Sequence, residues 1–142
     1  MTAKEKLVET IRTMINSKDF NPDELYSVMQ DYERFLKYNP ALVFQTACDA
    51  NQISVSTATP KKKLQKVNER ASMSRFLFYK YMREASGNKV SLDRMGAYLE
   101  RDHASVLYGI KRLNSLLEVK DEKATLAYQK FTTLMEVRKH LI

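Results

Sequence analysis

Hydrophobic side chains recur along most of the chain at the three- and four-residue spacing that lines one side of an α-helix. The first such segment runs from residue 3 to residue 14, with its apolar side at Leu7, Ile11 and Met14. Two further helices are predicted to begin at Asn-Pro pairs, because asparagine caps free amides and proline suits the first helical position. These pairs are Asn21-Pro22 and Asn39-Pro40, and we expect the second of these helices to end near residue 50.

Residues 53 to 60 interrupt this pattern, because they are rich in Ser, Thr and β-branched residues. They predict either an extended link or a poor helical turn. A basic run follows, which we expect to form a flexible loop, and its cations are Lys61, Lys62, Lys63 and Lys66.

The second half of the chain predicts four more helices. Residues 72 to 85 are apolar on most sides, as expected of a central helix packed by others. Their aromatic series, Phe76, Phe78, Tyr79 and Tyr81, resembles a stacking platform for single-stranded nucleic acid, but at helical spacing we expect it to be core. Ser91 caps a helix of about nine residues, and Asp102 caps the next one. In that helix the residues at core spacing are Val106, Leu107, Ile110, Leu113 and Leu117. The residues left for its exposed face are His103, Ala104, Ser105, Tyr108, Lys111 and Arg112. Residues 122 to 141 predict a last helix, with apolar positions at Leu126, Phe131, Leu134, Val137 and Leu141.

The composition agrees with an all-α fold, a multi-helix bundle. Only three glycines and three prolines occur in 142 residues, while helix-forming residues are common. Cys48 is the single cysteine, which excludes an intramolecular disulfide and a cysteine-based zinc site. No His-Glu-x-x-His spacing or glycine-rich phosphate loop occurs, so we expect no enzyme activity, no cofactor and no small-molecule substrate. No apolar run approaches the roughly 20 residues of a membrane span, and we expect a cytoplasmic protein.

Positive charge is concentrated in the middle of the chain. The formal net charge of the whole chain is +7, whereas residues 60 to 112 alone carry 13 Lys or Arg and 5 Asp or Glu. Such a segment suits a phosphate backbone, because cations that neutralise phosphates release condensed counterions. By charge alone, a basic surface without a partner is an equal alternative.

A short helix, a tight turn and a helix of about three turns form the helix-turn-helix pattern, whose second helix enters the major groove of DNA. The residues at the start of that second helix fit this chemistry. His103 and Ser105 can donate or accept at base edges, and the Ala104 methyl can meet a thymine methyl. Arg101 and the amides of the first turn suit a phosphate.

The run Arg101-Asp102-His103-Ala104-Ser105-Val106-Leu107-Tyr108 resembles the Arg-Asp-His-Thr-Thr-Val-Leu-His signature of the C-terminal DNA-binding domain of the bacterial replication initiator DnaA. The order around it also agrees, from a helix at 42–50 through the basic run to Ser74-Arg75-Phe76 and Ser91-Leu92. The resemblance covers roughly residues 39 to 118. It implies a Trp-repressor-like helix-turn-helix, here without the ATPase module of the initiator.

The resemblance also implies roles for individual residues. Residues 102 to 105 would lie near the bases, and Arg75 would contact phosphate. Met73 stands where the family has its minor-groove arginine, with Arg70 as the nearest cation. The chain has Leu99-Glu100 where the family has Gly-Gly, and Ala104 where it has threonine. We therefore expect a different turn and a different preferred sequence.

These observations predict a sequence-preferring binder of double-stranded DNA, associated with the nucleoid, that acts as a regulator or replication accessory of a bacterium, phage or mobile element. Its recognition helix spans about 102 to 117 in a domain at 39–118. The predicted DNA-contacting residues are Lys61, Lys62, Lys63, Lys66, Arg70, Arg75, Ser91, Arg101, Asp102, His103, Ala104, Ser105, Tyr108, Lys111 and Arg112.

The alternative is a structural or adaptor protein that keeps this fold and binds a protein partner through its flanks. These flanks are an N-terminal helical extension at 1–38 and a C-terminal helix within 119–142. Their amphipathic helices either form a homodimer or extend the core of the domain.

Overall fold

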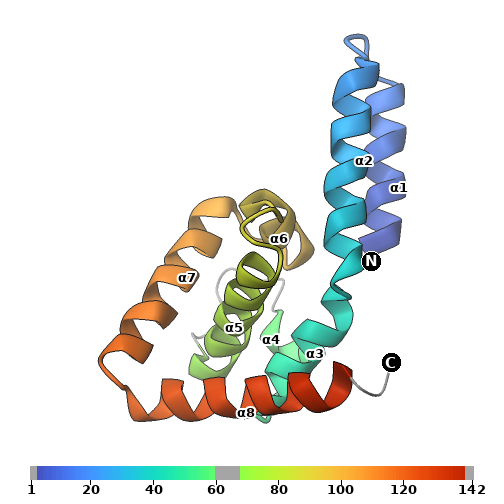
Figure 1. The fold of residues 1–142 in the computed structure, drawn as a ribbon. Coiled ribbons are helices and arrows are strands. Elements are labelled where there is room, and N and C mark those ends of the chain that lie inside the picture. The colour runs from blue at the N-terminus through green and yellow to red at the C-terminus, as the bar shows by residue number, and fades with distance from the viewer. Residues whose placement is uncertain (1–2, 60–67, 140–142) are drawn as a thin grey trace.

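The computed structural model describes residues 3–59 and 68–139, and within these ranges every regular element is an α-helix. The predicted all-α class is thereby confirmed. The basic run at 61–66 lies outside the described residues. Figure 1 shows the helices, which are α1 (Ala3–Ile15), α2 (Pro22–Lys37), α3 (Pro40–Ala50), α4 (Val55–Ala58), α5 (Glu69–Ala85), α6 (Leu92–Tyr98), α7 (His103–Glu118) and α8 (Glu122–Lys139).

Most of the helices begin at a side chain that caps their free amides. The predicted caps at Asn21, Asn39, Ser91 and Asp102 are all present. The segment after residue 53 forms one helical turn, α4, rather than an extended link. Helix α5 begins three residues earlier than predicted, because Asn68 accepts hydrogen bonds from the amides of Arg70 and Ala71.

Helix α5 lies at the centre of the molecule and packs against α3 and α7 (Figure 1). Its Phe78 is fully buried and contacts three aromatic rings, with centroid distances of 5.6 Å to Phe44, 6.0 Å to Tyr79 and 5.5 Å to Tyr98. Tyr79 is buried beside it, while Phe76 and Tyr81 pack half-buried against the core. The aromatic series of α5 is therefore core, as predicted, and not an exposed stacking platform.

Helix α8 runs across α3 and belongs to the same core (Figure 1). Its buried residues are Ala124, Ala127, Phe131 and Met135. The predicted apolar side was wrong in part, because Leu126 and Val137 are exposed. At its end, Arg138 donates to an Asp49 carboxylate oxygen at 2.6 Å.

Helices α1 and α2 form an antiparallel hairpin that projects from the rest of the molecule (Figure 1). Its base is fastened to α6 by two cations. Arg94 lies 3.4 Å over the Tyr32 ring, and its Nε is 2.9 Å from an Asp31 carboxylate oxygen. Lys6 Nζ donates to the carbonyls of Ala97 and Tyr98, at the end of α6, at 2.7 and 2.9 Å. The N-terminal extension is therefore joined directly to α6.

No helix within the described residues has both the length and the apolar character that a membrane crossing requires.

Candidate nucleic-acid interface

The turn between α6 and α7, residues 99 to 102, depends on a glycine in α6. The amide of Arg101 donates to the carbonyl of Gly96 at 2.7 Å. A Cβ atom at position 96 would collide with the carbonyl oxygen of Arg101. Glu100 has a φ of 58°, in the left-handed region that glycine favours. Glu100 stands where the DnaA signature has a glycine, and its backbone conformation is one that glycine adopts readily.

The first turn of α7 is organised by Asp102. Its carboxylate accepts a hydrogen bond from the amide of Ser105 at 2.8 Å. Bonds from the amide and the hydroxyl of Ser105 hold the pKa of Asp102 below its ordinary value, and His103 lowers it slightly further. The His103 Nδ1 atom lies 3.3 Å from a carboxylate oxygen of Asp93 in α6. Both of these side chains are mostly exposed, so the contact contributes little stability and leaves the imidazole accessible.

One face of α7 is open to solvent. All predicted members of this face are exposed, namely His103, Ala104, Ser105, Tyr108, Lys111 and Arg112. The opposite face is buried at Val106, Gly109 and Leu113. Leu107, predicted to be core, is 39% exposed and lies on the open side.

The burial of α7 shifts relative to the prediction because Gly109 brings the helix close to α5. A Cβ atom at position 109 would meet the ring of Phe76. Because Gly109 has no side chain, α7 packs its glycine side against α5, and Leu107 lies on the exposed side. The apolar spacing alone did not distinguish these two rotations.

The predicted contacts outside α7 fall in different places. Arg70 is exposed in the first turn of α5. Arg75 is half-buried and donates to the Ala58 carbonyl at 2.8 Å and to the Ser72 hydroxyl at 3.2 Å. The Ser91 hydroxyl accepts from the Arg94 amide and lies 3.4 Å from Asp31. Arg75 and Ser91 are therefore hydrogen-bonded within the fold, while the Arg70 side chain is exposed to solvent.

Positive charge gathers behind the start of α7. Burial lowers the pKa of Arg75, and the nearby charge of Arg101 lowers it further. Near Arg75 and Arg101, the Tyr79 hydroxyl is buried without a hydrogen-bond partner among the described residues. Burial raises its pKa to about 12, so it remains protonated at neutral pH.

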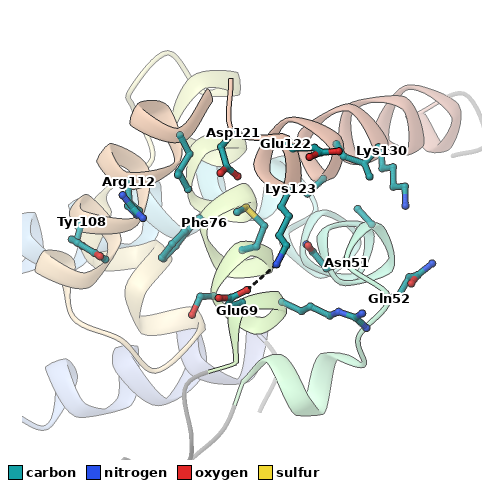
Figure 2. Close-up of a pocket in the computed structure, with 17 residues that line it drawn as sticks. Asn51, Gln52, Glu69, Phe76, Tyr108, Arg112, Asp121, Glu122, Lys123 and Lys130 are labelled. Atoms are coloured by element: carbon teal, nitrogen blue, oxygen red, sulfur yellow. Dashed lines mark ion pairs between the residues drawn. The ribbon is translucent and has the colours of Figure 1, made fainter. Parts of the chain in front are cut away.

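An open cavity of about 940 Å³ lies beside the exposed face of α7 (Figure 2). Tyr108 and Arg112 line it from α7, and Phe76 and Arg70 line it from α5. Figure 2 also shows the ion pair between Lys123 and Glu69, with an N–O distance of 3.7 Å. The cavity is thus lined by cationic and anionic side chains together with apolar ones such as Phe76 and Leu116.

Two kinds of reactive side chain, metal ligands and the cysteine thiol, can be located within the described residues. Within 3–59 and 68–139, no group of three or more His, Cys, Asp or Glu side chains is placed to hold a metal ion. Cys48 is buried, and burial raises the pKa of its thiol to about 11. A protonated, buried thiol is a poor nucleophile.

Lys6 is the residue near this region that sequence reasoning missed. It bonds the last carbonyls of α6, next to the turn that leads into α7, and burial lowers its pKa. It is 91 residues away from Ala97, and no local pattern marks such a contact.

Comparison with protein families, with curated proteins and with solved structures identifies no match to this chain.

Proposed function

We propose that this protein binds double-stranded DNA with a preference for sequence, by placing the first turns of α7 in the major groove. In this proposal α6, the turn and α7 form a helix-turn-helix of the kind found in the C-terminal domain of DnaA. The observation that carries it is the division of α7 into a buried face and an open face that begins with His103, Ala104 and Ser105.

The open face has the side chains that base readout requires. His103 and Ser105 hydrogen-bond to base edges, and the Ala104 methyl contacts a thymine methyl. Leu107 adds an apolar surface one turn later, which sequence reasoning had assigned to the core. Short side chains at the start of α7 let its backbone approach the bases closely.

Cations around this face bind the phosphates on either side of the groove. Arg101 precedes the helix, and Lys111 and Arg112 follow on its open side. Arg70 extends the same positive surface from α5. Two nitrogens of Arg75 are already hydrogen-bonded within the chain, so we give it a secondary role. The cations of the run at 61–66 complete the backbone contacts in this proposal.

The proposal fits a regulator or replication accessory of a bacterium, phage or mobile element that acts at the nucleoid. It requires no ATPase activity, since groove reading depends on binding alone. We do not assign the DnaA box as its target, because Ala104 replaces a threonine of the family signature.

Selection from random duplexes, followed by fluorescence anisotropy, tests the proposal. We expect an enriched motif. We expect Arg101→Ala to weaken binding to all duplexes and to reduce the slope of log affinity against log salt by about 0.9, the value of one phosphate contact. His103→Ala should cost about 1–3 kcal/mol, mainly on the enriched motif.

Lys18→Ala is the matched control, because it removes a cation at the tip of the hairpin, away from α7. It should leave the affinity and the salt slope nearly unchanged. Absence of an enriched motif, together with unchanged binding by the Arg101 and His103 variants, would contradict the proposal.

A further inference from the structure

We propose that the α1–α2 hairpin is a homodimer interface, at which two copies of the chain pack their hairpins into a four-helix bundle. The contact surface is an apolar strip made of Val8, Ile15 and Met29, which continues at the base of the hairpin into Leu36, a residue packed against the main core. The proposal concerns a different part of the molecule from the DNA-binding proposal and does not rest on it.

The two helices of the hairpin face each other through a regular inner seam. Along α1 the seam positions are separated by four and then three residues, and along α2 by three, four and three. They are Leu7, Ile11 and Met14 in α1, and Leu25, Val28, Tyr32 and Phe35 in α2. This alternation is the two-position pattern that a pair of packed helices needs.

Each helix carries a further apolar row directly after its seam residues. Val8 and Ile15 follow seam positions in α1, and Met29 and Leu36 follow seam positions in α2. In an antiparallel hairpin these equivalent positions lie along the same edge. Val8 is 54% exposed, Ile15 53% and Met29 46%, whereas Leu36 is half-buried at the base. The apolar row therefore forms one strip with a largely uncovered upper part.

The opposite edge of the hairpin is polar and already occupied. Thr10 lies there, with its hydroxyl 3.3 Å from that of Tyr32. Asp31 lies on the same edge and pairs with Arg94 of α6. The hairpin thus turns its polar edge to α6 and leaves its apolar edge free, on an arm that projects from the body (Figure 1).

The apolar pattern identifies a second hairpin as the occupant of the strip. Three apolar positions in seven are typical of helices in a four-helix bundle, and exceed what a single neighbour covers. In a lone hairpin each helix has one neighbour, whereas in a four-helix bundle each has two. Two-fold pairing of identical hairpins gives α1 and α2 one further neighbour each. The face is about 20 Å across two helices and about 24 Å long, a footprint of roughly 480 Å² per copy. The two copies together bury about 960 Å², close to the roughly 1,000 Å² total that marks a specific interface.

The charge of this region also favours a second copy. Residues 1 to 38 carry six Lys or Arg and seven Asp or Glu, so the arm is nearly neutral in a chain of net charge +7. Two copies meet here with little of the repulsion that the basic segment at 60–112 would impose. Arg12 and Glu33, both exposed on the arm, offer unlike charges for contacts at the rim.

Sedimentation equilibrium of the full chain, without DNA, tests the interface. We expect a mass of twice 16.5 kDa. The double variant Ile15→Glu/Met29→Glu should raise the dissociation constant of the dimer at least about a hundredfold, because it would bury unpaired carboxylates. Its helix content by circular dichroism should be unchanged, since both side chains are exposed in the monomer. A single Val8→Lys change should weaken the dimer in the same direction.

The matched control is Leu126→Glu/Val137→Glu, which changes two equally exposed apolar residues of α8. It should remain dimeric. A wild-type chain that stays monomeric at several hundred micromolar overturns the proposal, as does dissociation by the α8 pair with a dimer that survives the hairpin changes. Because the mass is measured without DNA, failure here leaves the DNA-binding proposal standing.

Discussion

Replacing Gly96 by alanine tests how the turn between α6 and α7 is built. In an unconstrained helix the change would stabilise the protein by about 1 kcal/mol. Here the added methyl would collide with the carbonyl of Arg101. Overpacking of this kind costs about 1–3 kcal/mol, and losing the Arg101–Gly96 hydrogen bond costs about 1 kcal/mol more. We therefore expect the free energy of unfolding to fall by about 1–3 kcal/mol.

Urea unfolding followed by circular dichroism measures this change, with Ala97→Gly as a control for helix propensity at the neighbouring exposed position. The control should lose about 1 kcal/mol or less. DNA affinity of the Gly96→Ala variant should also fall, because the collision moves the start of α7. A variant as stable as the wild type would refute the close approach of the turn to α6.

Three further predictions concern the turn, the hairpin junction and the cap of α7. Glu100→Gly should stabilise the protein by about 1 kcal/mol, because it relieves a left-handed conformation. It should also tighten DNA binding, because it removes an anion beside the major groove of the bound DNA. The control Lys120→Gly, at a residue with the same φ of 58°, should change stability alone. Arg94→Ala should speed proteolytic cleavage within the hairpin, since it removes the guanidinium stacked on Tyr32; cleavage at the wild-type rate would contradict the junction. Asp102→Asn should be less stable than the wild type at pH 6. The difference should shrink at acid pH, because the stability that the lowered carboxylate pKa provides above 3.8 is lost in the wild type as the pH falls through that lowered pKa; urea midpoints that differ by the same amount at pH 6 and at acid pH would exclude this origin.

Features that depend on neighbours along the chain were predictable. The caps at Asn21, Asn39, Ser91 and Asp102 were predicted from residue type alone, because a cap involves amides only two or three residues away. The exposed face of α7 was predicted for the same reason, since polar residues recur there at helical spacing.

Features that depend on the packing of distant helices were predicted less well. Leu107 and Leu126 have the spacing of core residues, yet both are exposed. Each of these helices carries more apolar residues than one neighbour can cover. In α7 the buried side contains Gly109, which lies close to Phe76 of α5. In α8 the buried side contains Ala124 and Ala127 in place of Leu126.

The sequence by itself determined the all-α class, the order of the helices and the polar start of α7, because helical periodicity and capping are local. Only the tertiary structure decided the rotation of α7 against α5, the left-handed backbone at Glu100 and the attachment of the hairpin through Arg94 and Lys6. These features join residues up to 92 positions apart. Such contacts arise from the packing of whole helices, which no short stretch of sequence encodes.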